Sequence, residues 1–202
     1  MRRRVIKAII FDCFGVLASD SWAQFTKKYL AGRPVAGRRA EELNRRSDVG
    51  LLSHDEWVSG MAVIAGVSED QVRLERQQNT DNNVLLAYIA TNLRSQYRTG
   101  LISNVGRGFR TDLFRSLQGT LFDEIVLSYK VGVTKPDERI YLLAAERLDV
   151  EIGECLFIDD RQVNVDGASE AGMRSMQYKD FESFTQQLEE VLNEHTSHTT
   201  QG

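Results

Sequence analysis

Four places in the chain put reactive polar residues at the ends of expected strands or in the loop that follows one. They are Asp12, Ser103 with Asn104, Lys135, and Asp159 with Asp160. Asp12 stands directly after the apolar run that ends at Phe11, and Asp159 follows a second apolar run. A buried charge is costly unless another group pairs with it. The carboxylates therefore indicate a bound cation, a reaction, or both.

The combination of residue types at these four places favours chemistry on a phosphoryl group. Two or three carboxylates, together with a backbone carbonyl and water, provide the oxygen ligands that Mg²⁺ prefers. A lysine and a serine facing such a metal can neutralise the charge of a phosphoryl group during its transfer. An aspartate nucleophile divides a difficult hydrolysis into two easier steps through a phospho-aspartyl intermediate.

The expected secondary structure would bring these residues together at one edge of a sheet. The sequence predicts strands at residues 5–11, 101–102, 125–128, 155–158 and 173–178, separated by helical segments. Among the helices, one is expected from Asn79 to Tyr97, and another opens at residues 134–137 with Pro136 in its first turn. Alternating strands and helices indicate an α/β fold, a doubly wound parallel sheet covered on both faces. Such sheets bind ligands at the carboxyl ends of their strands.

The stretch between the first strand and the rest of the sheet contains helical patterns and no convincing strand. Ser53 with Glu56 and Ser68 with Gln71 are typical of helix starts. We expect this stretch to form a small helical cap over the sheet edge. The predicted division is a core of residues 1–16 and 80–202 and a cap of residues 17–79.

Composition narrows the class of protein. The 202 residues carry a net charge of −4, which argues against general nucleic-acid binding. No segment approaches the roughly 20 apolar residues of a membrane helix, so no membrane partner is expected. Cys13 and Cys155 both lie in or beside apolar strand patterns, where a free cysteine packs as a small hydrophobe. Two cysteines and no export signal favour a cytoplasmic location.

Four ordered segments resemble the motifs of the haloacid dehalogenase superfamily, in its phosphatase-like branch. They are residues 11–17 (FDCFGVL), 101–104 (LISN), 132–136 (GVTKP) and 157–160 (FIDD). The resemblance covers nearly the whole chain. It implies a Rossmann-like core with a helical cap inserted after the first motif.

The resemblance also implies a role for each motif residue. Asp12 would be the nucleophile and a Mg²⁺ ligand, and Lys135 would neutralise both Asp12 and the transferred group. Asp160 would bind the metal directly, and Asp159 directly or through water. The remaining roles are a metal contact from the Phe14 backbone carbonyl, phosphoryl contacts from Ser103, Asn104 and Lys135, and bracing of the last motif by Asn164.

Phe14 departs from the pattern of most phosphatases in this superfamily, which carry a second aspartate at that position as general acid and base. Its absence can cost ~10²–10⁴ in rate. Protonation of the leaving group would then come from water, the substrate or a cap residue. Haloalkanoic acid dehalogenases of the superfamily also lack this aspartate, but they need no Mg²⁺, and their last motif is built on serine and asparagine.

The adjacent carboxylates of Asp159 and Asp160 favour a Mg²⁺-dependent phosphatase that acts on a small phosphorylated metabolite. A hydrolytic 2-haloacid dehalogenase and a catalytically weak binding or regulatory relative remain as alternatives. In the cap, we expect a group of arginines to form a solvated helix face, with the alternative that one or two contact an anionic substrate. These are Arg33, Arg38, Arg39, Arg45 and Arg46. We expect Trp22, Trp57 and Met61 to pack in the cap core, and His54, His195 and His198 to lie at the surface.

Overall fold

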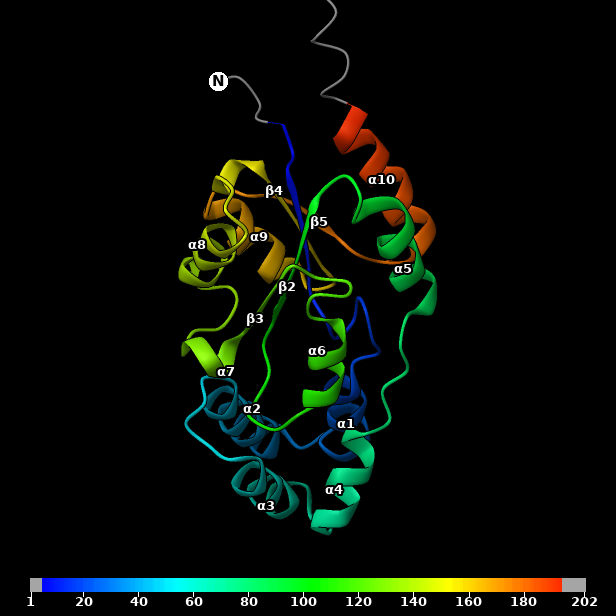
Figure 1. Ribbon diagram of the computed structural model, residues 1–202. Helices are drawn as coiled ribbons and strands as arrows, with labels where there is room; N and C mark the ends of the chain where they lie inside the picture. The colour runs from blue at the N-terminus through cyan, green and yellow to red at the C-terminus, as the bar shows by residue number, and fades with distance from the viewer. Residues whose placement is uncertain (1–4, 194–202) are drawn as a thin grey trace, which may run out of the picture.

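The computed structural model describes residues 5–193, which form a five-stranded parallel sheet in the order β3-β2-β1-β4-β5 (Figure 1). The strands are β1 (Ala8–Phe11), β2 (Arg98–Ser103), β3 (Glu124–Leu127), β4 (Cys155–Asp159) and β5 (Arg174–Gln177). β1 lies at the centre and pairs with both β2 and β4. The first strand is buried throughout, which explains its unbroken apolar sequence. The predicted α/β fold with a parallel sheet is confirmed.

Helices cover both faces of the sheet. Ile9 and Phe11 point into one face, and Ala8 and Ile10 into the other, as the alternation of side chains along a strand requires. The first face packs against α5 (Asn83–Tyr88), its π-helical continuation η1 (Ile89–Leu93), α6 (Thr111–Leu117) and α10 (Phe181–Asn193). The second packs against α8 (Glu138–Arg147) and α9 (Gln162–Glu170). Two short helices, α7 (Ser128–Val131) and η2 (Ile152–Glu154), complete this part.

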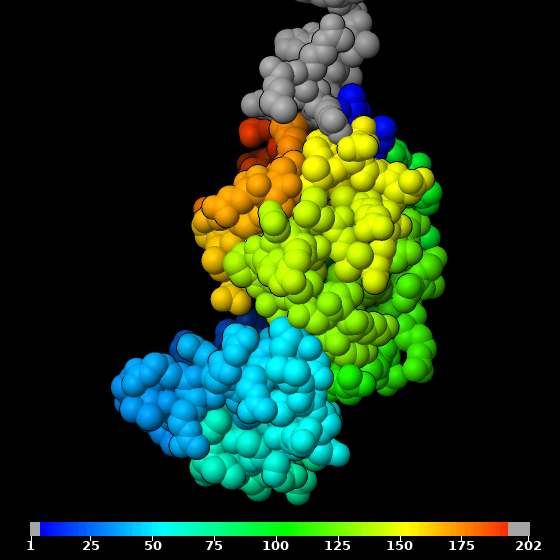
Figure 2. Space-filling model, turned by 90° about the vertical axis from the view of Figure 1, so that its left-hand side faces the viewer, coloured from blue at the N-terminus to red at the C-terminus, as the bar shows by residue number. Residues whose placement is uncertain are grey.

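Four further helices lie beyond the end of the sheet toward which β1 runs (Figure 1). They are α1 (Ser21–Tyr29), α2 (Pro34–Asp48), α3 (His54–Ala65) and α4 (Glu69–Arg76). They enclose a hydrophobic cluster of their own, which includes Phe25, Trp57 and Met61. Figure 2 shows them as a separate lobe against one end of the molecule. We propose that residues 17–79 form a separate unit, which we call the cap.

Local sequence signals define where the cap helices start. The Asp20 carboxylate accepts hydrogen bonds from the first turn of α1, and Ser53 and Glu56 form a capping box on α3. Ser68 caps α4 by accepting a hydrogen bond from the Gln71 amide. These helix starts agree with the sequence patterns.

The two chain segments that join the cap to the core run side by side. The Ser19 amide donates to the Thr80 carbonyl at 2.9 Å, and the Asn82 amide donates to the Leu17 carbonyl at 2.8 Å. The Asn82 side chain also donates to the Val16 carbonyl at 3.0 Å. The entry and exit of the cap therefore form one hydrogen-bonded pair next to the end of β1.

Two predicted helix boundaries are wrong. The helix expected from Asn79 begins at Asn83, because residues 79–82 pair with the other connecting segment and Asn82 caps the helix. Pro136 does not lie in the first turn of a helix. Asp137 is the N-cap of α8, and its side chain accepts a hydrogen bond from the Arg139 amide at 3.0 Å. Among residues 5–193, the structure contains no helix with the length and apolar character of a membrane span.

Candidate active site

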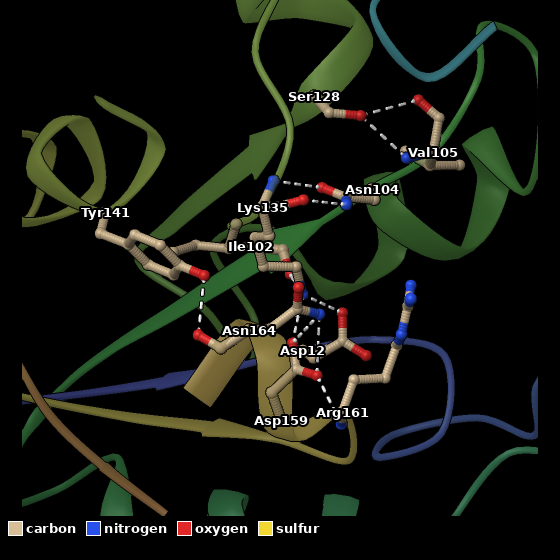
Figure 3. A network of polar contacts seen from close by, with 10 residues as sticks. All are labelled: Asp12, Ile102, Asn104, Val105, Ser128, Lys135, Tyr141, Asp159, Arg161 and Asn164. Atoms are coloured by element: carbon tan, nitrogen blue, oxygen red, sulfur yellow. Dashed lines mark hydrogen bonds and ion pairs between the residues drawn. The ribbon is translucent and has the colours of Figure 1, made fainter. Parts of the chain in front are cut away.

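The carboxyl ends of the three central strands place Asp12, Ser103 and Asp159 at one edge of the sheet. Figure 3 shows Asp12 and Asp159 close together there. The Asp12 amide continues the pairing of β1 with β4 by donating to the Ile158 carbonyl at 2.8 Å. Asp12 is 6% exposed and Asp159 is fully buried. Parallel pairing thus brings together residues that are about 150 positions apart in the sequence.

Lys135 pairs with both carboxylates from the loop between α7 and α8. Its ammonium donates to Asp12 Oδ1, to Asp159 Oδ2 at 2.6 Å and to the Ile102 carbonyl at 3.1 Å. The side chain is 1% exposed. Burial alone would lower the pKa of Lys135, but the neighbouring Asp12 and Asp159 outweigh it and raise that pKa. This buried charge is therefore paired and hydrogen-bonded, as its burial requires.

Asp159 is fixed by donors on several sides. Asn164 Nδ2 lies 3.0 Å from each Asp159 oxygen, and the Arg161 amide donates to Oδ1 at 2.9 Å. The carbonyl of Asn164 in turn accepts from the buried Tyr141 hydroxyl at 2.8 Å. Asn164 braces the last motif through Asp159 in this structure.

Asp160 approaches the site because residue 15 is a glycine. Gly15 has a φ of 104°, and a Cβ added there would lie 2.5 Å from Asp160 Oδ2. A side chain at position 15 would strain the backbone and displace the Asp160 carboxylate. Asp160 Oδ1 is buried and has no hydrogen-bond partner among residues 5–193. An unpartnered buried carboxylate oxygen is free to bind a cation.

Asp12, Asp159 and Asp160 form a group that fits a divalent metal ion. Each offers one carboxylate oxygen, and these oxygens lie within 4.8 Å of one another. Burial raises the pKa of Asp12 to about 7; Lys135 opposes this, while Asp159 and Asp160 add to it. Burial and the nearby Asp159 raise the pKa of Asp160 to about 6. A bound cation would offset this repulsion and keep all three carboxylates ionised.

The two residues of the second motif occupy different environments. Ser103 Oγ is buried and has no hydrogen-bond partner within the described part of the chain, so it is available to a ligand. Asn104 exchanges two hydrogen bonds with the Lys135 backbone, at 2.8 Å and 3.0 Å. The Asn104 side chain thus positions the Lys135 loop, a role that the sequence did not indicate.

A cavity of about 120 Å³ lies between the core and the cap. Its core wall includes Asp12, Phe14, Asn104, Arg107, Phe109, Lys135, Arg161 and Asn164. Its cap wall includes Asp20, Trp22, Asn44, Ser47, Asp48, His54, Trp57 and Arg76. One water needs about 10–15 Å³ of such a cavity, so there is room for a group of several heavy atoms.

The arginines at this cavity are not those that the cap sequence suggested. Arg33, for example, donates to the carbonyls of Ile64 and Ala65, and the cavity lining includes none of the five predicted residues. Arg76 lies there instead, with its guanidinium 5.4 Å from the Trp57 ring and 4.3 Å from the Phe109 ring. Burial lowers the pKa of Arg76 to about 10, against the opposing charges of Asp20 and Asp48.

The remaining single-residue predictions have mixed outcomes. Met61 is fully buried in the cap core, whereas Trp22 and Trp57 pack on that core and also line the cavity. His54 is half-buried against Trp57, with ring centroids 6.3 Å apart, so its predicted surface position is wrong. His195 and His198 lie outside the described residues. Cys13 and Cys155 are fully buried and free, as predicted.

Comparison with known proteins identifies the family of this chain. The sequence model of the haloacid dehalogenase-like hydrolase family matches residues 6–172. Phosphatase MT3486 of Mycobacterium tuberculosis is 31% identical over 191 residues, which cover 84% of this chain and 86% of that protein. D-Ribitol-5-phosphate phosphatase of Bacteroides thetaiotaomicron is 32% identical over 208 residues, or 94% of this chain and 100% of that protein.

A solved structure shows the same fold. A magnesium complex of a haloacid dehalogenase family enzyme from Bacteroides thetaiotaomicron superposes with a TM-score of 0.73 at 22% identity, covering 92% of this chain and 99% of that one. The parallel sheet, the carboxylates at its strand ends and the helical cap together form a Rossmann-like α/β fold of the haloacid dehalogenase type. The chain belongs to the haloacid dehalogenase-like hydrolase family.

Proposed function

We propose that the protein is a Mg²⁺-dependent phosphatase that hydrolyses a small phosphorylated metabolite through a phospho-aspartyl intermediate on Asp12. The observation that carries this proposal is the group of three carboxylates at the strand ends, two of which, Asp12 and Asp159, pair with Lys135; Asp12 and Lys135 also line the cavity. Both relatives described above are phosphatases, which supports the same reaction class. A small substrate agrees with the size of the cavity.

The residues at the floor suit a displacement at phosphorus. Asp12 presents its carboxylate at the carboxyl end of β1, where it attacks the phosphorus atom. Lys135 holds Asp12 in place and neutralises charge on the transferred phosphoryl oxygens. The unpartnered hydroxyl of Ser103 donates to a phosphoryl oxygen. Asn104 keeps the Lys135 loop in position and has one amide hydrogen left for the phosphoryl group.

The donor set fits Mg²⁺. Asp12, Asp160 and the Phe14 carbonyl would hold the ion directly, and Asp159 would contact it directly or through water. The three donors on Asp159 favour the contact through water. When bound, the ion neutralises negative charge on the phosphoryl oxygens during transfer. The orphaned oxygen of Asp160 is the observation on which this fit rests.

The two alternatives explain less of the structure. A hydrolytic dehalogenase accounts for Phe14, but it leaves the position of Asp160 against Gly15 without a purpose. A catalytically weak binding protein accounts for the missing acid at position 14. It does not require the buried Asp12–Lys135–Asp159 arrangement to remain intact. We also propose the cytoplasm as the compartment, because both free cysteines suit a reducing environment.

A panel of phosphorylated metabolites, assayed with Mg²⁺ and with EDTA, tests the proposal. We expect phosphate release that requires Mg²⁺ and is lost in Asp12→Asn, which has the same shape but cannot attack phosphorus. Chloride release from 2-chloropropionate in EDTA would instead indicate a dehalogenase. Mg²⁺-dependent ligand binding without turnover on any substrate of the panel would indicate a binding protein.

A further inference from the structure

Asp48 is a carboxyl group of the cap that no motif accounts for. It is the last residue of α2, and it lines the same cavity as Asp12 and Lys135. Asn44 Nδ2 donates to its Oδ2 at 2.9 Å. Its Oδ1 accepts no hydrogen bond from the described residues and is therefore available to a group in the cavity. Asp48 thus lines the cavity from the cap, whereas Asp12 and Lys135 line it from the core.

The end of α2 is held close to the core. A Cβ added at Gly106 would overlap Ser47 Oγ, and one added at Gly50 would lie 2.6 Å from the Tyr129 carbonyl oxygen. These two contacts flank Asp48 in the sequence. They dock the end of α2 on the loop that carries Asn104 and on α7. Asp48 is therefore fixed over the carboxyl ends of the strands.

The charges around Asp48 leave it able to give and take a proton near neutral pH. Burial raises its pKa to about 7, while Arg76 from α4 and Arg161 before α9 oppose the rise. The other charged or titratable residues that line the cavity are Asp20, His54, Arg107, Lys135 and Asp12. Burial lowers the pKa of His54, so its imidazole is a poor proton donor at pH 7. Asp20 Oδ1 is committed to the Trp22 and Ala23 amides at 2.8 Å and 3.2 Å.

We propose that Asp48 is the general acid and base that the chain lacks at position 14, an inference that rests on the proposed phosphatase function. Asp12 Oδ bonds to phosphorus as the ester P–O bond breaks, and the Asp48 carboxyl proton passes to the departing alcohol oxygen. The Asp48 carboxylate then takes a proton from water, whose oxygen bonds to phosphorus. The bond between phosphorus and Asp12 breaks, its electron pair returns to Asp12, and inorganic phosphate leaves.

Asp48→Asn separates this role from substrate binding, because an amide keeps the shape but cannot transfer the proton. We expect kcat/KM for an alkyl phosphate such as glycerol 3-phosphate to fall by ~10²–10⁴. With 4-nitrophenyl phosphate the leaving group needs no acid, so the first step stays fast and the second becomes slow. Stopped-flow absorbance would then show a burst of about one nitrophenolate per active site, followed by slow turnover.

The wild-type enzyme provides a second, independent readout. Its kcat/KM for the alkyl phosphate should fall as pH rises above about 7, because Asp48 loses its proton there. Asp48→Asn should lack this fall. For 4-nitrophenyl phosphate, whose leaving group needs no acid, the wild-type kcat/KM should not show this fall above about pH 7. Asp55→Asn, which removes an 83% exposed carboxylate from the same cap, is the matched control and should behave as wild type.

Three outcomes would overturn the inference. One is an equal loss on alkyl and aryl phosphates without a burst in a folded Asp48→Asn. Another is the survival of the alkaline fall in that variant, and the third is the appearance of these effects in Asp20→Asn instead. If the wild type releases no phosphate from these esters or from any member of the metabolite panel with Mg²⁺, the proposed function fails and the inference fails with it. If the wild type releases phosphate and Asp12→Asn does not, the proposed function stands, whatever the result for Asp48.

Discussion

Among the described residues, the core side and the cap side of the site leave different kinds of polar group without a partner. On the core side, Asp159 accepts hydrogen bonds from Lys135, Asn164 and the Arg161 amide, and the unpartnered atoms are oxygens, Ser103 Oγ and Asp160 Oδ1, among residues 5–193. On the cap wall, Trp57 Nε1 and Arg76 Nε are buried and have no hydrogen-bond partner within residues 5–193. Buried donors without partners are costly, so they mark places where a ligand is expected. The core side thus leaves a carboxylate oxygen for a cation and a hydroxyl for a phosphoryl group, whereas the cap side leaves N–H donors for the rest of a substrate.

This difference follows from the elements that build each wall. The core wall stands on strand ends and tight loops, which fix side chains within a small range of positions. The cap wall consists of helix faces joined to the core by one pair of connecting segments. We infer that the core wall determines the reaction and that the cap wall determines which leaving group enters.

Lys135→Met should have the largest effect, because it leaves two buried carboxylates without their cation. Removing one member of a buried ion pair costs about 3–5 kcal/mol in the free energy of unfolding. Urea unfolding in EDTA at pH 8 measures this loss. The cost should be smaller below about pH 7, where Asp12 takes up a proton. Phosphate release should also be lost, because the transferred phosphoryl charge is no longer neutralised.

Lys130→Met is the matched control for this change. Lys130 lies on α7, a few residues before the loop that carries Lys135, and is exposed. A loss in Lys135→Met no larger than in this control would show that the core wall does not depend on its buried lysine.

Much of the core side could be predicted from the sequence because Asp12, Ser103 and Asp159 stand at the carboxyl ends of strands. Asp12 and Asp159 follow apolar runs, and parallel pairing then brings them together without further information. The pairing of Asn104 with the Lys135 backbone could not be predicted, since it depends on how two loops pack.

The cap wall could not be predicted because helix faces reveal their orientation only through packing. Arg33 and Arg76 both lie in polar stretches of the cap. Arg33 binds carbonyls at the end of α3, whereas Arg76 stacks on Phe109 of the core. The apolar spacing of α4 indicates which face is buried, but it does not show that the helix ends beside the active site. The position of Asp48 at the cavity could not be predicted for the same reason.

Gly15→Ala should have the next largest effect. The added Cβ would lie 2.5 Å from Asp160 Oδ2, and the backbone φ of 104° disfavours any residue but glycine. We expect a loss of about 1–3 kcal/mol in stability and a weaker affinity for Mg²⁺ as Asp160 moves away. Gly32→Ala is the control, because φ there is 72° and the space is open. Equal Mg²⁺ affinities in the two variants, measured by calorimetry, would contradict the role of Gly15.

Phe14→Asp tests directly whether the general acid can come from the core instead of the cap. A carboxyl at position 14 would supply an acid from the core, so we expect faster turnover of alkyl phosphates. The gain should be larger in Asp48→Asn, about 10-fold or more, than in the wild type. Loss of the ring contacts with Phe109 and Phe114 should cost about 1–2 kcal/mol. Unchanged or lower alkyl rates in both backgrounds, in folded variants that bind Mg²⁺, would argue against position 14 as a site for the acid.

Asp160→Asn should change the stability of the protein least, and the sign of this change should depend on pH and on Mg²⁺. In the folded protein the pKa of Asp160 is raised from 3.8 to about 6. Ionisation therefore costs stability in wild type as pH rises from about 4 through about 6, whereas the amide does not titrate. In EDTA the Tm of Asp160→Asn should rise relative to wild type over this window and stay level above it. The difference should be a few degrees at most, since the group is partly exposed to solvent.

With saturating Mg²⁺ the order of the two Tm values should reverse above about pH 6, because only the carboxylate pairs with the ion. Thermal unfolding curves that run parallel across pH 4.5–8 in both media would show that Asp160 neither feels the neighbouring carboxylates nor holds a cation.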